Sequence, residues 1–414
     1  MFYSGAFVSL LSGSIAGSCD LTILEKDTAI VRLIYTLTYV VFLGLLVLRW
    51  KRVLYLLSRD KFISLLIGLA LISCLWSADF STTLNRFVAL FGTTSFGLYL
   101  ASRYSLPEQI QLLAKAFWLG ILFSLLFGIA IPSVGTMCSP HEGAWRGIYS
   151  HKNSLGKLMV LSVITFLLLL MRSARFRIQL WLGLSGSFLL LILSTSKSSL
   201  VTAITILMLL PVYRSLRLQD KILAPVFLSI SILLGGTSVL LLSNAESIFA
   251  ALGKDPTLTG RTELWAYSLK MIQQRIFLGY GFQSFWQGYS SPAAYVWRAI
   301  GWEAPNAHNG LIELAIDLGL LGLLVFLAGF ITNLVRAFVW VRVSRVSEGL
   351  WSLTYLTFLF LINITESSLF QRNNIYWILY VALTLTILTP PKKESDVEVN
   401  KSEPSIHALH LTNH

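Results

Sequence analysis

Charged residues are scarce in this chain. Only 13% of its 414 residues are Asp, Glu, Lys or Arg, whereas a soluble domain usually has about a quarter. The composition therefore excludes a soluble enzyme, a disordered protein and a coiled coil, since each of these needs more charge. Apolar residues dominate instead: they make up 55% of the chain and give it a mean hydropathy of +0.71.

Metal-binding and nucleotide-binding motifs are absent from the sequence. The three cysteines have no CxxC spacing and form no metal set with the six histidines. There is no GxxxxGK(S/T) loop, no zinc-type histidine motif and no Asp-x-Asp pair to hold a metal–nucleotide. ATP-driven transport and nucleotide-sugar transfer are therefore poorly supported, and we expect neither a metal nor a cofactor.

Long apolar runs recur from one end of the chain to the other. A run of about 18 or more residues can cross the roughly 30 Å hydrocarbon layer as a helix, and no strand-like alternation accompanies these runs. The sequence predicts an all-α polytopic membrane protein with about twelve transmembrane helices. The predicted spans are residues 1–19, 31–49, 62–76, 87–101, 114–132, 155–171, 179–195, 198–213, 222–242, 309–334, 349–366 and 374–389.

Basic residues gather in alternate loops between these spans. Such loops are typically cytoplasmic, which predicts that both termini are inside and that the formal net charge of +12 reflects topology rather than nucleic-acid binding. Cys19 and Cys138 then both map to the outer face, so a disulfide between them stays open. The predicted domains are a bundle of about nine helices over 1–242, a large outer loop with short helices over 243–308, membrane helices over 309–390, and a disordered cytoplasmic tail over 391–414.

Cations that the topology rule does not explain remain on the outer face. They include Arg146, Lys152, Lys197 and Arg261, and they outnumber the acidic residues predicted on that side. An excess of cations at one membrane face indicates an anionic ligand, most simply a phosphate or diphosphate. For any single lysine the alternative is a side chain that extends to the phospholipid headgroups.

Two polar segments at the ends of predicted spans are candidates for this ligand. Lys197 and Ser196 lie in a tight turn between two spans, where a buried charge is costly and indicates function; a short hairpin that meets water is the alternative. Residues 145–156 end a long outer loop and begin a span, so Lys152 and free backbone N–H groups form a suitable anion site. Asn153 could instead act only as a helix cap.

A histidine lies where the long outer loop re-enters the membrane. The unperturbed pKa of His308 suits a group that accepts a proton near neutral pH, and Asn309 and Glu313 follow it closely. A purely structural histidine is the alternative. Glu366, at the end of a later span, could hydrogen-bond between helices or orient a catalytic group, and both interpretations stay open.

One helix is predicted inside the long outer loop. Residues 259–265 open a helix-like stretch in which Leu264, Ser268 and Ile272 share one face, and the helix should end before Gly279. An amphipathic helix at this place would lie against the membrane surface.

At these residues the sequence resembles the O-antigen ligase and polysaccharide polymerase family, integral-membrane glycosyltransferases of bacterial envelopes. Each motif alone is weak, but together they occur in the family's order across about residues 75 to 370. The stretches that resemble the family are 76–79 (WSAD), 146–156 (RGIYSHKNSLG), 194–198 (STSKS), 260–265 (GRTELW), 278–281 (LGYG), 307–310 (AHNG) with 319–322 (GLLG), and 363–367 (NITES).

The resemblance implies a GT-C-like fold of twelve helices with a large periplasmic loop, and metal-independent transfer of a glycan from undecaprenyl diphosphate. It implies that His308 deprotonates the acceptor hydroxyl and that Arg261 holds the diphosphate leaving group. Lys197 stands where some ligases have arginine, and lysine loses the bidentate geometry. The further residues expected to bind the diphosphate or the glycan are Arg146, His151, Lys152, Asn153, Ser196, Lys197, Asn309 and Glu366.

Three functions fit this sequence to different degrees. The leading prediction is an exopolysaccharide or O-antigen polymerase in the bacterial inner membrane, with its active site facing the periplasm. The alternatives are a ligase that transfers lipid-linked glycan to lipid A–core, and a transporter or flippase of lipid-linked sugars, although no paired broken helices are visible. The expected partners are a lipid-linked glycan donor, a glycan acceptor, membrane lipids and other polysaccharide export or chain-length proteins, with no nucleic acid.

Overall fold

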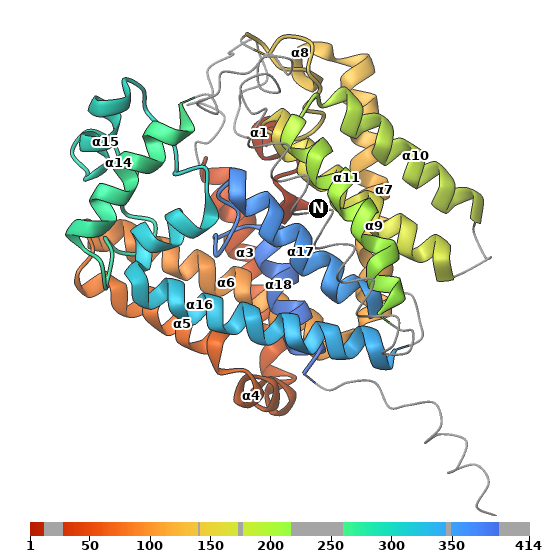
Figure 1. The fold of residues 1–414 in the computed structure, drawn as a ribbon, viewed down its shortest axis with the longest axis horizontal. Coiled ribbons are helices and arrows are strands. Elements are labelled where there is room, and N and C mark those ends of the chain that lie inside the picture. The colour runs from red at the N-terminus through yellow and green to blue at the C-terminus, as the bar shows by residue number, and fades with distance from the viewer. Residues whose placement is uncertain (12–27, 140, 173–176, 217–259, 345–348, 389–414) are drawn as a thin grey trace, which may run out of the picture.

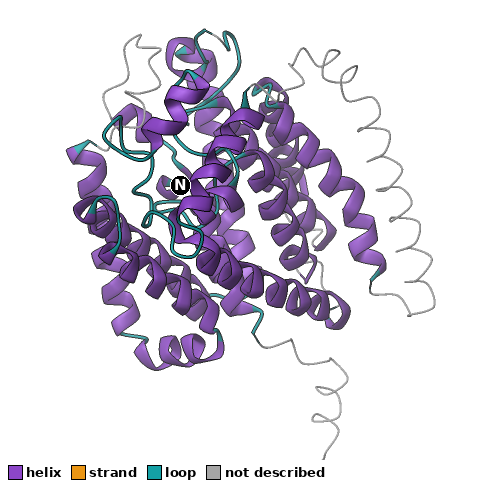
Figure 2. Cartoon of the chain, turned by 60° about the vertical axis from the view of Figure 1, so that its left-hand side comes forward, coloured by secondary structure: helices purple, strands orange, loops and turns teal. Residues whose placement is uncertain are grey.

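The computed structural model describes residues 1–11, 28–139, 141–172, 177–216, 260–344 and 349–388 (Figure 1). The described residues form helices and loops and contain no strand (Figure 2). Helices occur at ten of the twelve predicted spans, and the span predicted at 222–242 lies outside the described residues. These helices are α3 (Ala29–Val47), α5 (Lys61–Ile72), α6 (Phe80–Arg103), α7 (Leu106–Ala130), α9 (Lys152–Arg172), α10 (Arg177–Leu193), α11 (Lys197–Ser215), α16 (Gly310–Val343), α17 (Gly349–Thr365) and α18 (Ile375–Thr386).

Five of these helices, α3, α7, α9, α11 and α16, are long and apolar enough to cross a membrane. Together with the shorter apolar helices they support a polytopic membrane protein. The remaining elements are short: η1 (Phe2–Ser4), α1 (Val8–Leu11), α4 (Trp50–Arg59), η2 (Ser73–Leu75), α8 (Pro132–Gly135), α14 (Arg261–Gln274) and α15 (Ala293–Ile300). Helix α14 begins and ends close to where the sequence predicts, and Leu264 and Ser268 are buried on one face of it.

The beginning of the chain differs from the predicted first span. Residues 1–11 form only η1 and α1, and the Tyr3 hydroxyl is hydrogen-bonded to Thr38 in the middle of α3 at 2.8 Å. The Phe7 N–H donates to the Ile148 carbonyl at 2.9 Å, in a loop that the sequence places on the outer face. These contacts fold the segment into the bundle, so its described part does not form the first half of a span.

Helix α9 lies at the centre of the bundle, where it packs against α7, α10, α11 and α17 (Figure 1). The Ser162 hydroxyl of α9 and the Ser187 hydroxyl of α10 are hydrogen-bonded across the two helices at 2.7 Å. Gly183 of α10 packs directly on Phe166, which is fully buried. Close packing of this kind holds membrane helices together, because lipid offers no hydrophobic driving force between them.

Helix α16 is broken at Gly319. This glycine has φ 65° and ψ −166°, and a Cβ atom there would lie 2.3 Å from the Phe277 backbone. Residues 276–281 fill the break: the Leu320 N–H donates to the Ile276 carbonyl at 2.7 Å, and the Ile316 carbonyl accepts from Tyr280 N–H at 2.9 Å. Irregular backbone in a membrane helix needs such partners within the protein. The break therefore ties the segment after α14 to the membrane bundle.

Candidate functional site

Glu366, directly after α17, is the centre of a polar cluster at one end of the bundle. Its carboxylate accepts hydrogen bonds from Asn153 Nδ2 at 3.2 Å and from Arg261 Nη2 at 3.3 Å, and it pairs with Lys157 Nζ at 3.5 Å. The Glu366 side chain is only 14% exposed. A buried carboxylate needs such partners to remain charged, and here they come from two helices, α9 (Asn153 and Lys157) and α14 (Arg261).

Arg261 and Lys157 reach this cluster from opposite sides of α17. Arg261 is the first residue of α14, and its Nη1 also donates to the Thr365 carbonyl at the end of α17. Lys157, in the second turn of α9, also donates to the Ser368 hydroxyl at 3.1 Å. One carboxylate thus faces two cations, so the cluster has a surplus of positive charge.

The N-terminal ends of four helices meet at this cluster. Each end has backbone N–H groups without helical partners and a partial positive charge of about +0.5 from the helix dipole. These partial positive charges add to the positive charge of the side chains, and together they favour an anion at this place. The helices are α9, which holds Asn153; α11, which begins after Ser196; α14, which begins at Arg261; and α16, which begins after Asn309.

Asn153 joins two of the predicted motifs. Its Oδ1 accepts from the Ser196 hydroxyl at 3.1 Å, and its own N–H donates to His151 Nδ1 at 3.1 Å. Because Nδ1 of His151 is the acceptor, the imidazole is neutral, and burial lowers the pKa of His151 to about 4. Ser196 is only 1% exposed and is also hydrogen-bonded to Ser199 of α11. The Asn153 and Ser196 side chains therefore hold α9 and α11 together beside Glu366.

Two lysines next to these residues have no hydrogen bond or ion pair in the part of the chain that the structure describes. Lys152 is half-buried and Lys197 is exposed, and each is the first residue of a helix. The two ammonium groups repel each other electrostatically. Two neighbouring cations without an acidic partner are suited to bind a group that has more than one negative charge.

His308 lies one residue before Asn309, the residue that caps α16. Burial lowers the pKa of His308 to about 4, with the charges of Arg261 and Lys157 acting in the same direction and that of Glu366 opposing them. The imidazole is therefore neutral at pH 7 and can accept a proton. Its Nδ1 is buried and has no hydrogen-bond partner among the described residues.

The turn that holds His308 is fixed by side chains from several elements. His308 has φ 48°, an uncommon value for a residue other than glycine. Three consecutive N–H groups are each hydrogen-bonded to a side-chain oxygen: Ala307 to Glu313 at 2.7 Å, His308 to Asn306 at 2.9 Å, and Asn309 to Ser367 at 3.2 Å. This strained conformation is thus held in place at the candidate site.

Asn309 has structural partners for its whole side chain. Its Oδ1 caps α16 by accepting from the Leu311 and Ile312 N–H groups, and its Nδ2 donates to the Ile364 carbonyl at 3.2 Å. Arg261 contacts the neighbouring carbonyl, that of Thr365. Asn309 therefore joins the start of α16 to the end of α17, and its contact with a ligand stays a prediction.

Arg146 lies apart from the Glu366 cluster in its described contacts. It is 7% exposed, and its Nε donates to the Val134 carbonyl at 2.8 Å. Burial lowers the pKa of Arg146. This arginine holds the loop between α8 and α9, and its role at a diphosphate stays a prediction.

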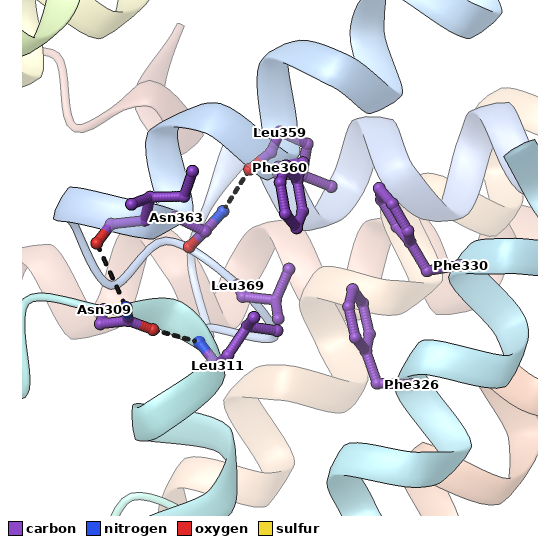
Figure 3. Close-up of a pocket in the computed structure, with 9 residues that line it drawn as sticks. Asn309, Leu311, Phe326, Phe330, Leu359, Phe360, Asn363 and Leu369 are labelled. Atoms are coloured by element: carbon purple, nitrogen blue, oxygen red, sulfur yellow. Dashed lines mark hydrogen bonds between the residues drawn. The ribbon is translucent and has the colours of Figure 1, made fainter. Parts of the chain in front are cut away.

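An apolar pocket opens between α16 and α17 beside Asn309 (Figure 3). Asn309 and Asn363 form its polar end, and aromatic rings of both helices form its walls (Figure 3). Phe360 is 45% exposed, so the pocket lies next to the outer surface of the bundle. The apolar lining residues are Leu311, Phe326, Phe330, Leu359, Phe360, Ile364 and Leu369.

Two comparisons with known proteins identify a family that this chain resembles. Residues 182–327 match the family model described as O-Antigen ligase. The exopolysaccharide production protein ExoQ of Rhizobium meliloti (strain 1021) is 26% identical over 309 residues, which are 71% of this chain and 69% of that protein. These findings confirm the resemblance to the O-antigen ligase and polysaccharide polymerase family, whose members are membrane enzymes that act on lipid-linked glycans. The matched range contains the positions of Lys197, Arg261 and His308.

Sequence reasoning missed one side chain of the cluster, Lys157. It did not include this lysine among the binding residues, although Lys157 pairs with Glu366. It left two interpretations open for Glu366, and the structure shows that the Glu366 carboxylate accepts hydrogen bonds from groups on α9 and α14. The signal that could have identified Lys157 is its position about one helical turn after Asn153, on the same face of α9.

Proposed function

We propose that this chain is a polymerase that joins lipid-diphosphate-linked oligosaccharide repeat units at the periplasmic face of the bacterial inner membrane. The observation that supports it most is the meeting of surplus cations, four helix N-termini and a neutral histidine around Glu366. A diphosphate leaving group needs positive charge, and a sugar hydroxyl that attacks needs a base.

The donor's diphosphate binds to the cations of the cluster. Arg261, which contacts the end of α17, stabilises the negative charge that develops as the bond between the sugar carbon and the diphosphate oxygen breaks. Lys152 and Lys197 add charge from the α9 and α11 side. No metal is needed in this scheme, because the cations of the chain take the role of the Lewis acid.

His308 accepts the proton of the acceptor hydroxyl as its oxygen attacks the sugar carbon. A base with a pKa near 4 is weak in the free protein. The bound diphosphate changes this, because its negative charge favours the protonated imidazole and raises the pKa of His308 toward its ordinary value. Donor binding thus prepares the base for its task.

The apolar pocket between α16 and α17 receives the first isoprene units of the donor's lipid chain. Its polar end is formed by Asn309 and Asn363, and Asn309 donates to the Ile364 carbonyl, next to the Thr365 carbonyl that Arg261 contacts. A lipid diphosphate that binds there would have its charged group at Arg261 and its chain toward the membrane.

A ligase that transfers the glycan to lipid A–core is the second candidate, which the description of the matching family model favours. The glycan profile of a deletion strain separates the two. Loss of chain length on lipid-linked sugar supports the polymerase, and loss of glycan attached to lipid A supports the ligase. A strain complemented with the wild-type gene is the control, and an unchanged profile contradicts both.

The orientation of the proposed site is tested independently. A reporter that is active only outside the cytoplasm, fused near Gly253 in the predicted outer loop, should be active. A reporter active only in the cytoplasm that works at this position would contradict the orientation and the mechanism with it.

A further inference from the structure

One tryptophan is exposed next to the candidate base. Trp302, in the turn after α15, is 39% exposed, and its ring centroid is 6.3 Å from that of His308. On another side, a Cβ atom at Gly260 would lie 3.8 Å from Trp302 Nε1. Trp302 therefore lies between His308 and the residue that precedes Arg261.

The indole N–H of Trp302 differs from those of two neighbouring tryptophans in its hydrogen bonding. Trp265 Nε1 donates to the Ala307 carbonyl at 2.8 Å, and Trp297 Nε1 donates to the Ala304 carbonyl at 2.9 Å. These two tryptophans hold the turn before His308. Trp302 Nε1 has no hydrogen-bond partner among the residues that the structure describes, and its ring remains partly open.

The surroundings of Trp302 have the chemistry of a saccharide site. Three polar residues lie within four positions of Trp302 in the chain: Arg298 and Glu303 are exposed, and Asn306 is half-buried. Their side chains can donate and accept hydrogen bonds. A pyranose has a face of C–H groups and a rim of hydroxyls. The C–H face packs on the electron-rich face of an indole ring, and the hydroxyls bind the polar groups around it.

We propose that Trp302 binds the glycan acceptor, by stacking one of its saccharide rings so that a hydroxyl of the acceptor lies at His308. This inference rests on the proposed function and adds to it the place of the second substrate. The donor binds around Arg261 and Lys197, and the acceptor arrives from the side of α15. Trp302 is in this scheme a binding residue that selects a sugar ring.

Transfer kinetics of the purified full chain in lipid nanodiscs test this proposal. We expect Trp302→Ala to raise the KM for the acceptor about tenfold, which corresponds to about 1.4 kcal/mol, and to leave binding of sugar-free undecaprenyl diphosphate unchanged. Trp302→Phe should restore most of the affinity, because it keeps an aromatic face. The matched control is Tyr295→Ala, since Tyr295 is 47% exposed on α15 and its described ring contact is with Tyr267.

A binding measurement without transfer separates this inference from the proposed function. The probe is the repeat-unit oligosaccharide released by mild acid from the host's own lipid-linked pool. Wild-type protein should bind it, and Trp302→Ala should bind it about tenfold more weakly. Such binding without any transfer would overturn the proposed function and support the saccharide site.

Three results would overturn the saccharide site. These are an unchanged acceptor affinity in Trp302→Ala, an equal loss in Tyr295→Ala, and an equal loss of undecaprenyl diphosphate binding. The last result is expected if Trp302 only anchors the protein at the membrane interface, where tryptophan is common.

Discussion

Two buried carboxylates lie toward opposite ends of α16, and they differ in their balance of charge. Asp60 is 1% exposed, caps α5 through the Phe62 and Ile63 N–H groups, and pairs with Arg336 at 2.9 Å. Arg336 is also hydrogen-bonded to Asn333. There, one anion meets one cation. At Glu366, one anion meets two cations, and two further lysines lie near without acidic partners among the described residues.

This difference distinguishes a balanced ion pair from a cluster with surplus cations, which we propose as a binding site. The charges of Asp60 and Arg336 balance each other, because Arg336 donates to Asp60 Oδ2. The other oxygen, Oδ1, accepts hydrogen bonds from the backbone N–H groups of Phe62 and Ile63. The cluster at Glu366 has more cations than anions among the described residues, and we propose that an external anion balances them. Charges that a fold leaves uncompensated are costly unless a ligand balances them, which is why the surplus cations indicate function more strongly than any single residue does.

The largest effect is expected at His308, since the hydrogen-bond partners of Asp60 among the described residues include no histidine. His308→Ala should lose about 10²- to 10⁴-fold in turnover, the usual contribution of a general base. Some activity should remain, because positioning and the cations still act. Steady-state transfer by purified protein measures this, and the lipid-linked donor should accumulate and still bind. Normal turnover of a His308→Gln enzyme would contradict the general-base role.

The pH profile sharpens the same assignment. The free protein should lose kcat/KM as the pH falls through about 4, because the neutral imidazole becomes protonated there. The limb in kcat should lie at a higher pH, since the bound diphosphate raises the pKa of His308. Both limbs should vanish in His308→Ala, and a limb that persists in this variant belongs to another group.

Arg261 and Arg336 provide a matched pair of arginines. Arg261→Ala should reduce transfer by about 10²- to 10³-fold at a normal protein level, since it removes hydrogen bonds to the developing charge of the leaving group. Arg261→Lys should recover little, because the fork geometry is lost. Full activity in Arg261→Ala would remove this residue from the site.

Arg336→Ala should show the opposite pattern. It leaves the Asp60 carboxylate buried without its cation, which costs about 3–5 kcal/mol of stability for a buried pair. Thermal unfolding in detergent should move to a lower temperature, while transfer per folded molecule stays normal. A selective loss of transfer with unchanged unfolding would contradict the purely structural role of the Asp60 pair.

The smallest effect is expected at Lys197. An exposed charge contributes about 0.2–1 kcal/mol, so Lys197→Ala should raise the KM for the donor only a few-fold, and less at high salt. Lys197→Arg should be tolerated, because it keeps the charge. The control is Lys51→Ala on α4, an exposed lysine far along the chain from the cluster; an equal effect there would mean that Lys197 acts only through the general charge of the protein.

The positions of most helices were predictable because the membrane imposes one pattern. Apolar runs of sufficient length predict α7, α9 and α16 directly, and the start of α14 follows from Gly260 and the run after it. The break in α16 was not predicted. Residues 319–322 read equally well as small residues in a continuous helix, and only the approach of residues 276–281 requires the positive φ of Gly319.

The candidate site was predictable in its motifs but not in its centre. His308 and Asn153 are recognisable because each lies at the end of a predicted span, and Arg261 is recognisable because it begins the helix predicted inside the outer loop. The pairing of Glu366 with Lys157 joins residues more than 200 positions apart, and such a contact depends on how the helices pack rather than on local pattern. The exposure of Trp302 likewise follows from the fold of the segment around it, which no periodicity reveals.

The break in α16 has a consequence for how the protein is made. A helix that enters the bilayer with unpaired N–H and C=O groups at its middle is costly until those groups find partners. Here the partners, residues 276–281, precede α16 in the chain, so they are synthesised before the helix needs them. Assembly can therefore close the break as soon as α16 leaves the ribosome, without waiting for α17 or α18.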